Sequence, residues 1–146
     1  MTDIENSKAI LKKGNHTCVL CKGNTVYTSN KRGIVPLLDI FENNCCVNEF
    51  SAADKIVGKA AAMLFVKAGV SNVFAEVISQ KAVEILQKNN IQCSWDTVCN
   101  CIVNRAGTGP CPIETAVMDV CDNDFDIAYQ KILQRSNELR SQKNKE

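Results

Sequence analysis

The chain has 146 residues and a formal net charge of +1 at pH 7, from 17 Lys and Arg against 16 Asp and Glu. Hydrophobic residues make up 45% and charged residues 23%, which is typical of a globular domain and excludes a disordered, collagenous or coiled-coil chain. The balanced charge predicts neither a nucleic-acid partner nor a membrane surface.

The sequence carries no membrane-spanning or secretion signal. Its longest apolar stretch, residues 60–66, is far shorter than the ~20 residues that cross a bilayer. Residues 1–5 contain acidic side chains where a secretion signal would carry basic ones, so we expect a cytoplasmic protein. Without a repeat or linker, residues 1–146 are predicted to form one domain. It would have an N-terminal helix in residues 1–14 and a frayed polar tail in residues 141–146.

The first third of the chain predicts a helix, a β-hairpin and a second helix. Thr2 and Glu5 fit a capping box at the start of the first helix. Two β-rich runs, residues 17–21 and 25–28, are joined by a Gly-Asn turn that favours a hairpin. A second helix is expected to begin near Pro36, because proline suits a first helical turn.

The middle of the chain alternates helices with strands. Residues 54–66 are apolar on nearly every face and predict a buried central helix that ends at Gly69. Strands are expected at residues 70–77 and 91–95, separated by a helix that Ser79 caps. This alternation predicts a layered α/β protein whose sheet is opened by the antiparallel hairpin.

The last third is less regular. Residues 97–103 fit either a strand or a helix, and the Gly- and Pro-rich run at residues 104–114 predicts a loop. A short helix is expected at residues 112–120, and apolar residues at helical spacing from Phe125 onward predict a final amphipathic helix.

The nine cysteines are an odd number and about 6% of the chain, below the density of a disulfide scaffold. Reduced thiols are therefore predicted. Cys18 and Cys21 have the two-residue gap of a zinc knuckle, but positions three apart in a strand point to opposite faces. Cys99 and Cys101 have the wrong spacing to complete such a site. We predict structural thiols rather than a metal site.

A first cluster of candidate site residues contains Asp54, Lys55 and Lys59, at the predicted start of the central helix. Lys55 and Lys59 would share a helical face. Asp54 suits the positive end of the helix dipole, whereas the lysines oppose it, and Gly58 inside a helix often marks a close backbone approach. These features suggest a phosphate or carboxylate ligand. The alternative is a solvated first turn with an ordinary Asp–Lys ion pair.

A second cluster lies in the predicted loop. The amides of residues 107–109 could surround an anion, and Arg105 adds a fork-shaped donor. Cys111 lies beside a helix start, where the dipole favours a thiolate, so it could be a nucleophile, a redox thiol or a packed residue. His16, the only histidine, precedes the first strand, so a Cys–His pair would need an unusual chain path. The common nucleotide-binding motifs are missing.

Two blocks of the sequence together resemble a known family. Residues 53–62 read Ala-Asp-Lys-Ile-Val-Gly-Lys-Ala-Ala-Ala, and the second block combines Asn104-Arg105 with Gly-Thr-Gly-Pro-Cys-Pro-Ile-Glu at residues 107–114. They resemble an uncharacterised family of small bacterial and archaeal proteins grouped with the cytidine deaminase-like superfamily. The resemblance runs from about residue 18 to residue 128. It implies a three-layer α/β/α sandwich with a mixed sheet opened by the hairpin.

The resemblance does not extend to the zinc ligands. Active members of the superfamily carry His or Cys, then Ala and Glu, at the start of the central helix, and Pro-Cys-x-x-Cys at the next helix. Here residues 52–54 read Ala-Ala-Asp and residues 78–81 read Ile-Ser-Gln-Lys. The similar Gly-Pro-Cys-Pro at residues 109–112 comes one strand and one helix too late, with Glu114 in place of the second cysteine. Because a catalytic zinc needs three protein ligands, we expect no metal, no cofactor and no cytidine deaminase activity.

The leading hypothesis is a zinc-free protein that binds a small anionic or nucleotide-like ligand between the two blocks. The predicted ligand-binding residues are Asp54, Lys55, Lys59, Asn104, Arg105, Thr108 and Glu114. One alternative is an enzyme that uses Cys111 as nucleophile, helped by Lys55 or Lys59, with Asp54 as a further catalytic candidate. The other is a homodimeric interaction protein without a ligand, which associates through a sheet edge or the C-terminal helix.

Overall fold

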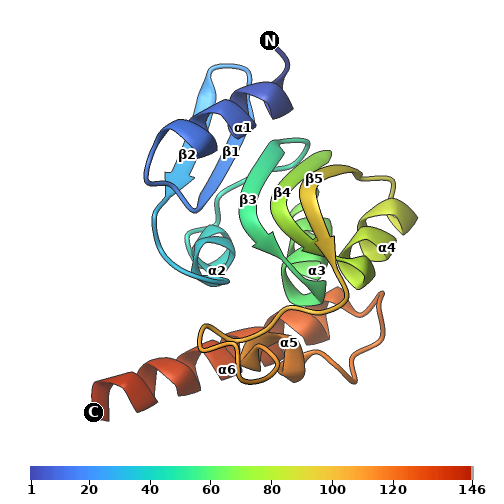
Figure 1. Ribbon diagram of the computed structural model, residues 1–146. Coiled ribbons are helices and arrows are strands. Elements are labelled where there is room, and N and C mark those ends of the chain that lie inside the picture. Colours follow the sequence, from blue (N-terminus) through green and yellow to red (C-terminus); the bar gives the residue numbers. More distant parts are fainter. Residues whose placement is uncertain (146) are drawn as a thin grey trace.

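The structure, a computed structural model, describes residues 1–145, and the side chains of residues 1–142. This part of the chain contains five strands and six helices (Figure 1). In chain order they are α1 (Asp3–Lys13), β1 (Cys18–Lys22), β2 (Thr25–Ser29), α2 (Val35–Glu42), β3 (Ser51–Val57), α3 (Lys59–Ala68), β4 (Asn72–Ser79), α4 (Gln80–Lys88), β5 (Gln92–Cys99), α5 (Pro112–Ala116) and α6 (Phe125–Lys145).

The strands form one mixed sheet in the order β2-β1-β3-β4-β5. Strand β1 pairs antiparallel with both β2 and β3, whereas β3, β4 and β5 are parallel. The parallel strands are joined by α3 and α4, because a parallel pair requires a long crossover connection. The predicted α/β class, the mixed sheet and the opening hairpin are therefore confirmed.

The sheet separates two apolar clusters, because successive strand residues point to opposite faces. The larger cluster contains Cys18 and Ala52 together with residues of α2, α3, α4 and α6. The smaller cluster contains Val19 and Cys21 and packs under Leu11 of α1. Figure 1 shows α1 on one side of the sheet and α3 and α4 on the other. The Cys18 and Cys21 side chains thus lie on opposite faces, as the strand spacing predicted.

Several predicted helix ends are confirmed. The Thr2 hydroxyl and the Glu5 carboxylate form a capping box at the start of α1. Gly69 ends α3 with a φ of 79°, a left-handed conformation that glycine adopts at little cost. The Ser79 hydroxyl accepts a backbone N–H in the first turn of α4 at 3.2 Å.

The central helix begins later than predicted. Asp54 and Lys55 belong to β3, where Asp54 lies opposite Cys18 of β1, and α3 begins at Lys59 after Gly58. The alanine-rich run is therefore a buried strand followed by a helix. Lys55 and Lys59 share no helical face, and Gly58 is the residue before the helix rather than one inside it.

The segment after β4 also differs from its prediction. Strand β5 extends to Cys99, so only the first part of the ambiguous residues 97–103 is strand. Val103 then forms an isolated bridge with Pro110, and α5 ends at Ala116 instead of residue 120.

The last helix, α6, runs along one side of the molecule (Figure 1). It continues to Lys145, through most of the tail that was predicted to fray, and Glu146 lies outside the described residues. Within residues 1–145, no helix combines the length and the apolar character needed to cross a membrane.

Candidate functional site

The two predicted blocks meet where β3 ends and α3 begins. The Glu114 carboxylate, from α5, accepts the backbone N–H of Lys59 at 2.7 Å and that of Ala60 at 2.8 Å. Gly58 makes this contact sterically feasible, since a Cβ there would overlap the carboxylate and lie 2.9 Å from Ile102 Cγ1. The close approach predicted at Gly58 is therefore an approach by the chain's own carboxylate.

Glu114 occupies the place that was predicted for a ligand anion. The first N–H groups of a helix lack intrahelical partners and form its positive end, so a carboxylate there is stabilised. Burial raises the pKa of Glu114, while its hydrogen bonds from Ala60 and Lys59 work in the opposite direction. The N-terminus of α3 is thus capped from within the protein.

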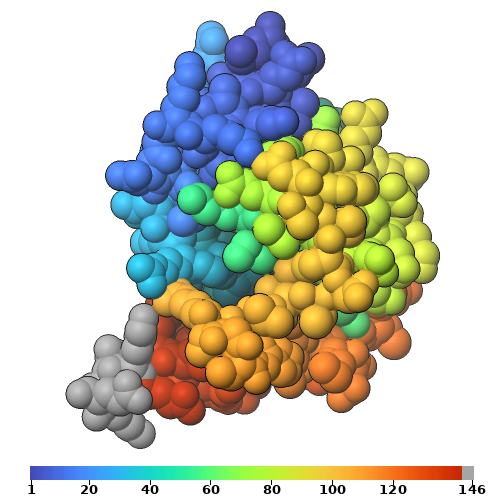
Figure 2. All heavy atoms as spheres, in the orientation of Figure 1, coloured from blue at the N-terminus to red at the C-terminus, as the bar shows by residue number. Residues whose placement is uncertain are grey.

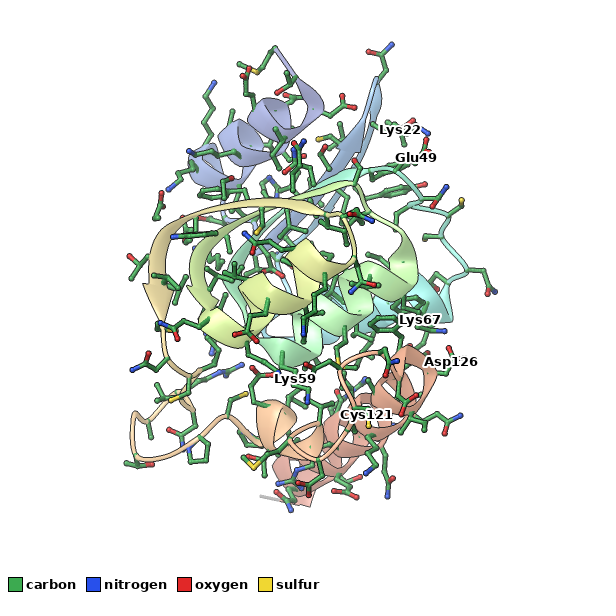
Figure 3. The ribbon with its side chains drawn as sticks, turned by 90° about the vertical axis from the view of Figure 1, so that its right-hand side faces the viewer. Lys22, Glu49, Lys59, Lys67, Cys121 and Asp126 are labelled. Atoms are coloured by element: carbon green, nitrogen blue, oxygen red, sulfur yellow. The ribbon has the colours of Figure 1, made fainter. Side chains whose placement is uncertain are left out.

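Lys59 is also engaged inside the protein. Its Nζ donates to the Val120 carbonyl at 2.6 Å and lies 3.4 Å from Asp122 Oδ1, and only 11% of its side chain is exposed. Asp122 Oδ2 lies 2.6 Å from Lys81 Nζ, and this hydrogen bond is the main cause of the lowered pKa of Asp122. Figure 3 shows Lys59 between α3 and the segment that leads into α6. Lys59 and Lys81 therefore hold that segment against the starts of α3 and α4.

The loop at residues 104–109 is organised by Asn104. Its Oδ1 accepts the Thr108 N–H at 3.0 Å, its carbonyl accepts the Gly107 N–H at 3.1 Å, and its Nδ2 donates to Thr108 Oγ1 at 3.2 Å. The backbone N–H groups of Gly107 and Thr108, which were predicted to hold an anion, thus donate to Asn104 within the loop. Arg105 is exposed and forms no ion pair among the side chains of residues 1–142.

Cys111 precedes α5 and is half-buried. Its backbone N–H donates to the Ile102 carbonyl at 3.1 Å, and its carbonyl accepts the Thr115 N–H at 3.0 Å. Within the described side chains, its sulfur has no hydrogen-bond partner that could act as a base. His16 lines a different part of the molecule, beside the hairpin.

Asp54 is buried, with 7% of the residue exposed. Burial raises its pKa to about 7, although N–H groups of Lys55 and Ile56 favour the charged form, the first at 2.8 Å. Burial, and secondly the charge of Asp54, raise the pKa of Cys18 well above its ordinary value, so Cys18 is a thiol at neutral pH. Lys55 is exposed, whereas Asp54 and Lys59 are not, so these three residues do not form a common anion site.

A cavity of about 530 Å³ lies between the hairpin and α2. Its polar lining includes the side-chain amides of Asn15, Asn30 and Asn43 and the hydroxyl groups of Tyr27 and Thr28, and Leu20 and Ile40 contribute apolar surface. Figure 2 shows the surface hollowed between the cyan residues of α2, the green end of β3 and the orange loop, although β3 and that loop contribute no residue to the cavity lining. The size falls within the range of small-molecule sites.

The cavity contains polar groups that the protein leaves available. Within residues 1–142, the side-chain amides of Asn15, Asn30 and Asn43 and the hydroxyl of Thr28, all on exposed residues, form no hydrogen bond with another protein group. Lys31 also lines the cavity and pairs with Asp39 at 2.8 Å. None of the predicted ligand-binding residues lines this cavity. No motif marked its lining, because separate segments contribute to it and only the fold brings them together.

The chain is similar to known proteins both in its sequence and in its fold. Residues 6–134 match the family described as TM1506, a domain of unknown function (DUF1893). The chain belongs to the DUF1893 family. A solved structure of a DUF1893 family protein, TM1506 from Thermotoga maritima, is 22% identical with a TM-score of 0.82, and the match covers 91% of this chain and 89% of that chain. No curated protein matches the chain.

The part of the chain that matches DUF1893 contains the whole candidate site. The cavity lining, Asp54, Glu114 and Asp122 all fall within residues 6–134, and the matched region ends inside α6. The family description leaves the function open. The structural likeness, at this identity, shows the fold.

Proposed function

We propose that this DUF1893 chain is a one-domain, zinc-free member of the cytidine deaminase-like fold that binds a small nucleotide-like ligand. The five-stranded mixed sheet with its opening hairpin supports this fold, and so do helices on both of its faces, as expected of a three-layer sandwich. The ligand would occupy the cavity between the hairpin and α2, because the chain's own carboxylate already fills the anion position at α3.

The residues at the helix starts do not fit a deaminase zinc. Helix α3 begins with Gly58-Lys59-Ala60 and α4 with Ser79-Gln80-Lys81, so neither start offers a thiol or an imidazole. The sequence comparison placed residues 52–54 at the start of the central helix, where the deaminases carry zinc ligands. Those residues lie in β3 instead, so they do not correspond to the ligand positions. Across the part of the chain that the structure describes, no three His, Cys, Asp or Glu residues gather as a metal site would require.

We therefore expect purified protein to contain no stoichiometric zinc and to release no ammonia from cytidine or deoxycytidine. Elemental analysis after a chelator wash and an ammonia assay check this. One zinc ion per chain that survives the wash would contradict the proposal, as would ammonia release above a no-protein blank.

The observation that carries the binding proposal is the set of unpartnered amides around the cavity. An amide offers both donors and an acceptor, which matches the mixed donor and acceptor edge of a heterocyclic base. The exposed ring of Tyr27, which stacks on Phe50 at a centroid distance of 5.7 Å, provides a flat apolar surface. Lys31 and His16 place cationic or donor groups in the same lining, where they suit a phosphate on the ligand.

The test is thermal stabilisation by cytidine, adenosine, their 5′-monophosphates and inorganic phosphate, followed by calorimetry. We expect a nucleoside or nucleotide to raise the melting temperature, because a ligand that binds only the folded state stabilises it. Replacing both Asn30→Ala and Asn43→Ala is expected to weaken that binding about tenfold or more, since each lost hydrogen bond costs about 1 kcal/mol.

The matched control changes the loop instead of the cavity. Arg105→Ala and Thr108→Ala remove polar side chains from the predicted loop site and should leave the affinity unchanged. Stabilisation by phosphate alone, abolished by the loop variants, would relocate the site to the loop. Failure of all five probes to stabilise the protein would refute the nucleotide-like class.

A further inference from the structure

Strand β5 is the longer of the two edge strands of the sheet. It has eight residues and pairs with β4 on one side, and within residues 1–145 no strand lies on its other side, whereas the opposite edge strand, β2, has five residues. Figure 3 shows β5 as the left-hand border of the sheet, and Figure 1 shows no helix lying across it. Its outer backbone N–H and C=O groups therefore face solvent.

This edge lacks the features that usually prevent pairing with another strand. Proteins protect long edges with lysine, proline, bulges or a covering element. Residues 92–99 contain no Lys, Arg or Pro, and Trp95 and Val98 are 38% and 43% exposed. Trp95 and Val98, three positions apart in the strand, lie on opposite faces of the sheet, so each face carries one of them at this edge. Val103, in the segment that follows, is 55% exposed.

The charge distribution favours an identical strand as the partner. Asp96 is the single charged residue of β5, and Lys12 of α1 neutralises it with an Nζ–Oδ2 distance of 2.6 Å. A second β5 would therefore bring no unpaired like charge against the first. A strongly acidic or basic partner strand would meet no complementary charge on this edge. Two identical strands can also pair antiparallel about a two-fold axis, which is the commonest oligomer symmetry.

We propose that β5 pairs antiparallel with β5 of a second copy of this chain, so that two sheets join into one continuous sheet. The backbone groups of the two edges satisfy one another, and Trp95 and Val98 of each copy lose water-exposed area. The pairing closes after two copies, because each chain uses its β5 edge once.

The experiment measures the mass of the full chain by sedimentation or light scattering over a range of concentrations. We expect the mass to rise from 16.0 kDa toward twice that value as the protein concentration increases. Trp95→Lys and, separately, Val98→Lys place a charge on the edge of both copies and should weaken dimerisation about tenfold or more. Met118→Lys, at a side chain that is 63% exposed and outside the sheet, is the matched control and should leave it unchanged.

The Trp95→Lys or Val98→Lys change could also perturb folding, so hydrogen exchange of the native chain provides a second way to identify the interface. Amides of residues 92–99 should exchange more slowly at high protein concentration, with the melting temperature of each variant recorded alongside. A chain that stays monomeric throughout would overturn the proposal, as would a dimer whose protected amides lie elsewhere. The cavity variants Asn30→Ala and Asn43→Ala should leave the mass unaltered, so failure of the ligand proposal and failure of this one are distinguishable.

Discussion

Replacing Gly58 with alanine should lower the free energy of unfolding by about 3 kcal/mol, because it separates Glu114 from the N-terminus of α3. The new Cβ would lie 2.5 Å from Glu114 Cδ and 2.9 Å from Ile102 Cγ1, so the carboxylate must move away. Its hydrogen bonds to Lys59 and Ala60 are then lost. The backbone itself is not strained by alanine, since Gly58 has a φ of −103°.

Urea unfolding of a double-mutant cycle tests this explanation. Glu114→Ala alone should cost a similar amount, and adding Gly58→Ala to Glu114→Ala should cost less than Gly58→Ala does in the native chain, because only the contact with Ile102 Cγ1 at 2.9 Å then remains. Gly109→Ala is the matched control, since a Cβ there meets no atom within 4 Å. If Gly58→Ala behaves like Gly109→Ala, or if the two changes are additive, the role assigned to Glu114 is wrong.

Asp54→Asn should change how stability depends on pH. The pKa of Asp54 is raised from 3.8 to about 7, so between these values the folded chain retains a proton that the unfolded chain has lost. Raising the pH through this window therefore destabilises the native protein by about 1.4 kcal/mol per pH unit. Asparagine is neutral throughout, so the variant should gain stability relative to the native chain as pH rises from 4 to 7, with no further gain above that.

The measurement is urea unfolding of both proteins from pH 4 to pH 8, with the difference between them plotted. Other groups, including Glu114, titrate in both chains and cancel in the difference. Asp39→Asn, which removes a carboxylate that pairs with Lys31, is measured alongside as the comparison variant. A difference for Asp54→Asn that is constant with pH would show that the carboxyl is not protonated in the folded state.

Local side-chain chemistry explains which parts of the fold could be predicted. The capping box of Thr2 and Glu5, the left-handed Gly69 and the Ser79 cap act within a few residues, so the sequence shows them directly. The boundary between strand and helix within residues 51–62 was harder to predict. The first four residues of β3 are buried on both faces, so they lack the alternation of a half-buried strand, and next to an alanine-rich helix the two cannot be separated by periodicity. Only Gly58 marked the boundary.

The candidate site was predictable in part for a similar reason. Gly58 signalled a close approach, and Glu114 makes it, whereas the anion expected at the helix start was a ligand and not the chain's own carboxylate. That the partner is Glu114 depends on where the chain, 55 positions beyond Lys59, brings α5. The cavity gave no signal at all, because Asn15, Asn30 and Asn43 are ordinary loop and helix-end residues until the hairpin and α2 face each other.

The contact between α1 and β5 bears on how the chain folds. Strands β3 to β5 with α3 and α4 form consecutive βαβ units, and β1 with β2 forms a hairpin, so both parts are built from neighbouring residues. The Lys12–Asp96 contact instead spans 84 positions, and its formation closes a long loop at an entropic cost. Contacts of this kind raise the contact order and slow folding. We expect the βαβ units and the hairpin to form first, with the docking of α1 across β3 and β4 as a late step.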